Sequence, residues 1–286
     1  MSIERVGVVG CGLMGSGIAE VCARAGRDVV IREIDPPTAQ AAQQRIEKSL
    51  QRAVKGGKLS ADAVGAVLGR IRFSSDYADF RDRQIVIEAI VESEPEKLAV
   101  FASLDEVVEA SDAILATNTS SIPVMKLAMA TQRPHAVCGL HFFNPVPVLR
   151  LVELVVSLLT SPETAQRASA FASEVLGKHV IRSQDRAGFI VNQLLIPYLL
   201  SAIRMVESGF ATQDDIDTGM VMGCNHPMGP LALLDLIGLD TTLAVAESLY
   251  EEFREQLYAP PPLLSRMVEA GLLGRKTGRG FFDYRK

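Results

Sequence analysis

A glycine-rich segment directly after the first apolar run is the feature that most constrains the fold of this chain. Residues 10–15 read Gly-Cys-Gly-Leu-Met-Gly, follow the β-branched run at residues 6–9 and open a helical pattern. A strand, a tight glycine turn and a helix in this order form the phosphate cradle of dinucleotide-binding domains. In such a cradle Gly10 permits the turn, Gly12 lets a pyrophosphate approach the backbone, and Gly15 allows close packing of helix and strand. We therefore expect a pyrophosphate at the helix N-terminus, where N–H groups lack partners.

Short apolar runs alternate with longer helical patterns over the first two thirds of the chain. Strand–helix alternation is typical of a parallel sheet with helices on both faces, and near-continuous apolar runs are typical of strands buried on both faces. We therefore predict an α/β fold that begins with a Rossmann-type, doubly wound sheet. The predicted strands are residues 6–9, 29–32, 71–73, 85–90, 113–116, 137–142, 151–156 and 180–181, and the predicted helices include residues 13–24, 38–54, 96–109 and 163–176.

Strand patterns fade near residue 185, and the remainder reads as helices separated by Gly and Pro. Residues 189–208 form a long apolar stretch in which Pro197 predicts a helix kink. Thr212 and Asp215 are spaced as in a capping box, with Asp where Glu or Gln is usual, and predict the start of another helix. Three consecutive prolines predict a loop over residues 258–262.

These patterns predict two domains. We expect residues 1–184 to form an NAD-binding Rossmann domain and residues 185–286 to form an all-helical domain for substrate binding and dimerisation. The helical half is mostly apolar, and residues 189–205 carry too few charges to face water alone. We therefore expect a homodimer built mainly by this half.

Composition excludes several classes of protein. The net charge is −5, from 34 acidic and 29 basic residues, whereas nucleic-acid binding needs a basic surface. The cysteines have no CxxC spacing, so we expect reduced thiols and no metal site. No apolar run approaches the roughly 18 residues of a membrane-spanning helix, and the N-terminus lacks the pattern of a signal peptide. We therefore expect a cytoplasmic protein with no nucleic-acid or membrane partner.

Glu33 is the candidate residue for binding the adenosine ribose of a dinucleotide. It follows the predicted strand 29–32 and lies 18 residues after Gly15, close to the spacing of about 20 found in such sites. A carboxylate there accepts hydrogen bonds from both ribose hydroxyls and repels a 2′-phosphate, which favours NAD over NADP. Arg32 would suit a 2′-phosphate, but strand alternation should turn it away from Glu33. Asp35 is the alternative ribose ligand.

His141 and Glu153 are the candidate acid–base pair. His141 ends an apolar strand, and the carboxyl ends of strands in such sheets face the ligand crevice. Glu153 lies inside the next apolar strand, where an unpaired carboxylate would cost several kcal/mol of desolvation. Neighbouring strands would bring the two side chains together, and a His–Glu pair can exchange a proton with a substrate. A purely structural ion pair is the competing interpretation.

Motifs along nearly the whole chain support a resemblance to a known family. They lie at residues 10–19, 88–92 (Glu-Ala-Ile-Val-Glu), 118–121 (Asn-Thr-Ser-Ser), 141–148 (His-Phe-Phe-Asn-Pro-Val-Pro-Val), 151–153 (Leu-Val-Glu), 188–192 (Gly-Phe-Ile-Val-Asn), 226–230 (His-Pro-Met-Gly-Pro) and 276–281 (Lys-Thr-Gly-Arg-Gly-Phe). In combination they resemble the 3-hydroxyacyl-CoA dehydrogenases, and most closely the short bacterial 3-hydroxybutyryl-CoA dehydrogenases.

The resemblance implies hydride transfer between NAD(H) and an acyl-CoA substrate, interconverting (S)-3-hydroxyacyl-CoA and 3-oxoacyl-CoA, and it implies a dimer. By family likeness His141 is the base and Glu153 orients it, while Ser120 and Asn192 bind the substrate and assist the reacting oxygen. Ser49 matches a serine that contacts CoA; Gly56 stands where the family has a lysine for a CoA phosphate, so Lys55 or Lys58 would substitute. The residues matching family positions near the dinucleotide are Gly10, Gly12, Leu13, Met14, Gly15, Glu33, Glu92, Lys97, Ser120, Asn144 and Lys276.

Two alternatives remain open from the sequence. One is a dehydrogenase of the same fold that acts on another 3-hydroxy acid, and the other is an NAD-binding protein without catalytic activity. The presence of His141, Glu153, Ser120 and Asn192 argues against the second.

Overall fold

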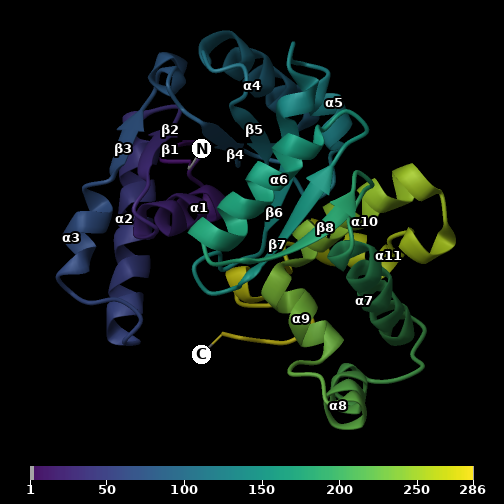
Figure 1. The fold of residues 1–286 in the computed structure, drawn as a ribbon. Helices are drawn as coiled ribbons and strands as arrows, with labels where there is room; N and C mark the ends of the chain where they lie inside the picture. Colours follow the sequence, from purple (N-terminus) through teal and green to yellow (C-terminus); the bar gives the residue numbers. More distant parts are fainter. Residues whose placement is uncertain (1–2, 286) are drawn as a thin grey trace. The chain divides into compact units, whose positions relative to one another are not determined.

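The computed structural model describes residues 3–285 and divides them into two compact units, which meet in the chain between Asp185 and Arg186. Within the described residues, the first unit contains one eight-stranded sheet in the order β3-β2-β1-β4-β5-β6-β7-β8 (Figure 1). The predicted Rossmann-type sheet is confirmed. Its strands are β1 Arg5–Val9, β2 Asp28–Arg32, β3 Ile71–Ser74, β4 Ile85–Glu88, β5 Ile114–Thr117, β6 Val137–Phe142, β7 Leu151–Val156 and β8 His179–Gln184.

The strand order places a ligand crevice at the end of β1. Strands β1 to β6 all pair in parallel, β7 runs antiparallel to β6, and β8 is parallel to β7. From β1 the chain moves outward to β2 and β3, and then returns to β4 on the other side of β1. Such a reversal opens a crevice beyond the carboxyl ends of the central strands. The glycine-rich loop follows β1 at this point.

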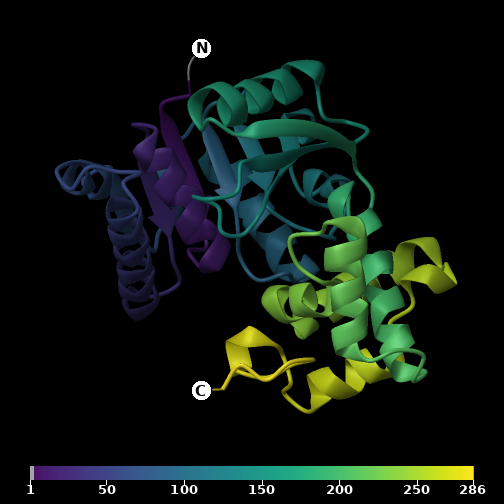
Figure 2. The ribbon, with the colours of Figure 1, turned by 90° about the horizontal axis from the view of Figure 1, so that it is seen from below.

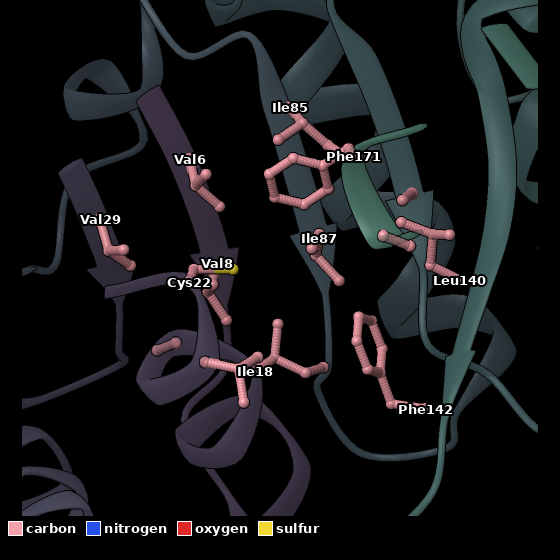
Figure 3. Close-up of a cluster of buried hydrophobic side chains, with 14 of the residues drawn as sticks. Val6, Val8, Ile18, Cys22, Val29, Ile85, Ile87, Leu140, Phe142 and Phe171 are labelled. Atoms are coloured by element: carbon pink, nitrogen blue, oxygen red, sulfur yellow. The ribbon is translucent and has the colours of Figure 1, made fainter. Parts of the chain in front are cut away.

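Helices cover both faces of the sheet. The helices of this unit are α1 Leu13–Arg24, α2 Pro36–Lys55, α3 Ala63–Leu68, α4 Glu94–Val107, α5 Val124–Ala128 and α6 Pro162–Ala170. On the face of α1, the Ile18 and Cys22 side chains pack towards Val8 and Ile87 of the sheet (Figure 3). Leu140 and Phe142 of β6 join the same buried cluster. Because side chains alternate along a strand, His141 between them is directed to the opposite face.

The second unit is helical, as predicted. Its helices, drawn in green to yellow in Figure 2, pack around their own buried apolar cluster, which includes Leu199, Leu234 and Leu249. Thr212 accepts the Asp215 N–H and begins a helix, which confirms the predicted cap. The helices are α7 Val191–Glu207, α8 Gln213–Cys224, α9 Pro230–Ile237, α10 Leu239–Phe253 and α11 Pro262–Glu269. Among residues 3–285, no helix combines the length and apolar character needed to cross a membrane.

Several predicted boundaries differ from the structure for local reasons. Strand β4 ends at Glu88, because the Glu88 carboxylate accepts the Ile90 N–H and turns the chain. Pro197 lies inside α7, which continues through it. The predicted loop 258–262 is shorter than expected, since a 3-10 turn ends at Tyr258 and α11 begins at Pro262.

Candidate active site

The glycine-rich loop has the geometry of a pyrophosphate cradle. Gly10 has φ of +83°, which favours glycine, and a Cβ on Gly15 would lie 1.9 Å from the Gly10 carbonyl oxygen. A Cβ on Gly12 would meet no atom within 4 Å, so the backbone there is open to an approaching ligand. Gly12 is the N-cap residue of α1 and provides no side-chain hydrogen bond to the first turn. The helix therefore keeps backbone N–H groups for an anion, and the loop fits a dinucleotide.

Glu33 lies against this loop. Its side chain is 7% exposed, and Oε1 accepts the Cys11 N–H. The Arg32 guanidinium instead lies over the Tyr77 ring, 4.1 Å from its centroid, so the two neighbouring side chains have different partners, as alternation predicts. Asp35, the alternative ribose ligand, caps α2 by accepting the Thr38 N–H at 2.7 Å, and this hydrogen bond lowers the pKa of its carboxyl.

Arg45 is a contact of the glycine-rich loop that the sequence interpretation missed. From α2, its guanidinium donates to the Cys11 carbonyl at 2.8 Å and to Ser16 Oγ at 3.0 Å. Burial raises the pKa of the Cys11 thiol to about 12, so this loop cysteine is uncharged at neutral pH. Arg45 therefore supplies the positive charge beside the loop.

His141 and Glu153 form a hydrogen-bonded pair, as their strand positions predict. They are directly opposite each other in the antiparallel register of β6 and β7. His141 Nδ1 lies 2.7 Å from Glu153 Oε2, and the two side chains are 8% and 0% exposed. The Phe143 ring packs on the imidazole, with centroids 4.6 Å apart. The strand pairing thus holds the His141 imidazole at the carboxyl end of β6.

A second cluster of charges lies at the carboxyl ends of β4 and β5. Lys97 of α4 contacts Glu88 at 2.6 Å and Glu92 at 3.3 Å, and its side chain is 1% exposed. Glu92 Oε1 accepts the N–H groups of Ser120 and Ser121 at 3.0 and 3.2 Å. Burial raises the pKa of Glu92, but the Lys97 charge and the hydrogen bonds outweigh it, and the pKa is lowered overall. Direct contacts of Glu92 and Lys97 with a cofactor stay predictions.

Ser120 lies on a loop that is tied to the strand carrying His141. Asn118 Oδ1, at the start of this loop, accepts the Phe142 N–H at 2.9 Å. Phe142 directly follows His141, so one side-chain bond joins the ends of β5 and β6. Asn144, beyond β6, is exposed. The structure thus places Ser120 and His141 on neighbouring strand ends, while their roles toward a ligand stay predictions.

The residues that are predicted to contact CoA lie on or just beyond α2. Ser49 hydrogen-bonds the buried Glu20 carboxylate, whose pKa is raised by burial and partly lowered by this bond. Lys55 lines a groove of about 700 Å³ between α2 and α3, and its basic neighbours there are Arg45, Lys48 and Arg52. Lys58 is exposed beyond the helix end.

Two predicted site residues belong to the second unit. Asn192 lies in the first turn of α7 and is half-buried. Lys276 is exposed, and its Nζ contacts both carboxylate oxygens of Asp240 at 2.5 Å. Their predicted roles in substrate and cofactor binding stay predictions.

Comparison with known proteins identifies the family. The family model for the 3-hydroxyacyl-CoA dehydrogenase NAD binding domain matches residues 5–186, and that for the C-terminal domain matches residues 188–284. The chain belongs to the 3-hydroxyacyl-CoA dehydrogenase family. The resemblance inferred from the sequence motifs is thereby confirmed, and with it an NAD-binding dehydrogenase domain.

The similarity to individual dehydrogenases extends over the whole chain. A 3-hydroxybutyryl-CoA dehydrogenase of Mycobacterium tuberculosis is 59% identical over 99% of both chains. The mitochondrial hydroxyacyl-coenzyme A dehydrogenase of Sus scrofa is 40% identical over 99% of this chain and 92% of its own length. Among solved structures, the (S)-3-hydroxybutyryl-CoA dehydrogenase of Ralstonia eutropha is 45% identical, with a TM-score of 0.94 and full coverage of both chains.

Proposed function

We propose that this dehydrogenase interconverts (S)-3-hydroxyacyl-CoA and 3-oxoacyl-CoA with NAD(H), and that its substrate is short, such as 3-hydroxybutyryl-CoA and acetoacetyl-CoA. The observation that carries the proposal is the His141–Glu153 pair, with 2.7 Å between Nδ1 and Oε2, at the ligand-facing edge of a family NAD-binding domain. The names of the M. tuberculosis and R. eutropha relatives support the short acyl chain.

His141 is the general base in oxidation and the general acid in reduction. The Glu153 carboxylate binds Nδ1, which selects the tautomer whose Nε2 takes the proton of the 3-hydroxyl group. As the ring becomes positively charged, the fully buried Glu153 stabilises it. Bound NAD⁺ supplies the hydride acceptor. Ser120 and Asn192 hydrogen-bond the reacting oxygen and orient it.

Gly10, Gly12, Leu13, Met14 and Gly15 hold the pyrophosphate in this proposal. Glu33 binds the adenosine ribose, and its position against the loop supports that role. In this proposal the dinucleotide is also bound by Glu92, Lys97, Ser120, Asn144 and Lys276. Ser49 and Lys55 meet the CoA nucleotide, and the basic side chains around the α2–α3 groove suit its phosphates.

Reduction of acetoacetyl-CoA by NADH tests the proposal directly. Loss of absorbance at 340 nm that depends on acetoacetyl-CoA supports it, and a series of acyl lengths then locates the preferred substrate. Turnover with a free 3-oxo acid but none with the CoA ester would show a dehydrogenase of another 3-hydroxy acid. Binding of NADH without turnover of any 3-oxo compound would show a non-catalytic protein.

Glu33 is expected to make the enzyme prefer NADH to NADPH. Its carboxylate would repel a 2′-phosphate, and Arg32, held over Tyr77, is not placed to neutralise one. Replacing Glu33 with Ser should raise the KM for NADH. It should also lower the preference for NADH, measured as kcat/KM with NADH divided by kcat/KM with NADPH. Asp35→Ser is the matched control, because serine can still cap α2 and the removal of this carboxylate should leave the ratio unchanged. Equal kcat/KM values for both cofactors in the wild-type enzyme would reject the ribose assignment.

A homodimer formed mainly by the second unit is expected in solution. Large apolar side chains are exposed there, including Leu194 at 74%, Phe210 at 76% and Met222 at 81%. Burial of these side chains against a second copy would remove apolar surface from water and so stabilise a dimer. Light scattering at micromolar concentration should give twice the mass of the chain, whereas a monomer mass would contradict the expectation.

We also propose a cytoplasmic location, which the four free cysteines support.

A further inference from the structure

A buried lysine bonds the segment that joins β6 to β7. Lys178, directly before β8, is 9% exposed, and its ammonium group donates to the carbonyl oxygens of Val146 and Leu149 at 2.5 and 2.8 Å. Burial lowers the pKa of this amine, because its charged form loses hydration there. A buried charge is costly unless it is hydrogen-bonded, and both of these bonds go to the same segment.

The β6–β7 segment, residues 143–150, contains no helical or strand residue. Pro145 and Pro147 have no N–H group with which to bond a neighbour. The Leu149 N–H donates to the Pro145 carbonyl at 2.9 Å and closes one turn. Carbonyl groups that are buried in such a segment need donors from other parts of the protein. Lys178 supplies two of these donors.

The opposite side of the β6–β7 segment packs on α1. Val146 is 2% exposed, and a Cβ on Gly17 would lie 2.8 Å from Val146 Cβ. The missing side chain of Gly17 therefore lets Val146 approach the helix backbone. Gly17 begins the second turn of α1, and the first turn follows the glycine-rich loop. The segment is thus held between Lys178 and the helix that begins at the pyrophosphate cradle.

Asn144 depends on this segment for its position. It is exposed and directly precedes the proline whose carbonyl closes the turn. His141, in contrast, lies within β6 and is placed by its pairing with Glu153 of β7. A change in the β6–β7 segment should therefore move Asn144 more than it moves His141.

We infer that Lys178 is a positioning residue for Asn144. By holding the β6–β7 segment against α1, Lys178 sets the place of Asn144 relative to the N-terminus of that helix. It thereby sets how well Asn144 meets a dinucleotide that is bound at the glycine-rich loop. The inference deepens the proposed function and rests on it for the role of Asn144 in cofactor binding.

The variant Lys178→Met tests this inference, because methionine keeps an apolar stem and removes the donors. We expect the dissociation constant and the KM for NADH to rise about threefold to tenfold, the contribution of one hydrogen bond. The kcat at saturating NADH and acetoacetyl-CoA should fall by a smaller factor, since strand pairing still holds His141. A lysine that only stabilised the fold would change Tm and leave the affinity for NADH unchanged.

Arg133→Met is the matched control. Arg133 is also largely buried and donates to backbone carbonyls, those of Ala110 and Val108, at 2.7 and 3.0 Å. These two residues precede β5, so they lie at the edge of the sheet opposite to the carboxyl ends of the parallel strands. The variant should lower Tm and leave the dissociation constant for NADH unchanged.

Two further variants test whether the effect passes through Asn144. In an Asn144→Ala background, Lys178→Met should add little to the dissociation constant for NADH. Gly17→Ala displaces Val146 from the other side of the segment and leaves the lysine in place. It should also weaken NADH binding, and less so in the Asn144→Ala background. This variant tests the inference if Lys178→Met does not fold.

Amide hydrogen exchange of Val148 and Leu149 gives a readout that does not depend on activity. Both N–H groups donate to the Pro145 carbonyl, and they should exchange faster in Lys178→Met than in the wild type. Unchanged exchange, unchanged NADH affinity, or an equal further loss of affinity in the Asn144→Ala background would overturn the inference. These measurements need no acyl-CoA. A wild-type protein that binds NADH without reducing acetoacetyl-CoA would therefore reject the proposed substrate and not the inference.

Discussion

Replacing His141 with Gln should lower kcat for acetoacetyl-CoA reduction by about 10²–10⁴, the usual contribution of general acid–base catalysis. Glutamine keeps much of the shape of the imidazole but cannot exchange a proton at this position. NADH affinity should change little, because the pyrophosphate cradle of residues 10–15 belongs to other strand ends. Steady-state kinetics and NADH fluorescence titration measure the two quantities separately. If the variant retained most of its turnover, the His141–Glu153 pair would be structural.

The variant Glu153→Gln tests the role of the carboxylate that binds His141. The amide can still bond the ring, but it no longer balances the charge of the protonated imidazole, so kcat should fall here too. Because the two residues are joined by a 2.7 Å hydrogen bond, the double variant should lose less than the product of the single losses. Fully multiplicative losses would mean that the two side chains act independently.

Alanine at Gly15 should damage both stability and cofactor binding. Its Cβ would lie 1.9 Å from the Gly10 carbonyl oxygen, a backbone atom that cannot move without disturbing the turn. We expect the free energy of unfolding to fall by about 1–3 kcal/mol, the usual cost of overpacking. NADH affinity should fall as well, since the shifted turn no longer presents the N–H groups of α1. Chemical denaturation and fluorescence titration measure the two effects.

Gly12→Ala is the matched control for this prediction. A Cβ there meets no protein atom within 4 Å, so stability should fall much less than in Gly15→Ala. The methyl group would instead occupy space that the pyrophosphate needs, and NADH affinity should fall by about tenfold or more, equivalent to about 1.4 kcal/mol. Normal NADH binding by this variant would show that the pyrophosphate does not approach the loop at Gly12.

Much of the fold and the contact between His141 and Glu153 could be predicted because both depend on local patterns. Apolar runs identify the strands, and the glycine spacing identifies the first crossover. Glu153 could be identified from the sequence because it is a charged residue within an apolar strand. Its partner, His141, lies on the adjacent strand. The boundaries of helices such as α2 were less accurate, because Asp35 caps it three residues before the expected start.

The Glu88–Lys97 pair was missed although part of the signal was present. Glu88 also ends an apolar run, Ile85 to Ile87, so the reasoning that singled out Glu153 applies to it. Its partner, however, comes from a helix, and the third member of the cluster, Thr117, comes from another strand 29 residues away. Arg45 was missed for the same reason, because its contact with the glycine-rich loop spans 34 residues. Such contacts follow from tertiary packing and not from periodicity.

The antiparallel register of β6 and β7 has a consequence for how this site can change in evolution. His141 faces Glu153 because backbone hydrogen bonds set the pairing, and a slip by one residue would turn one of them to the opposite face of the sheet. The connecting segment has contacts of its own, because the Lys178 ammonium donates to the Val146 and Leu149 carbonyls. A single insertion inside either strand would therefore separate His141 from Glu153, whereas a change in the connecting segment leaves both residues within their own strands.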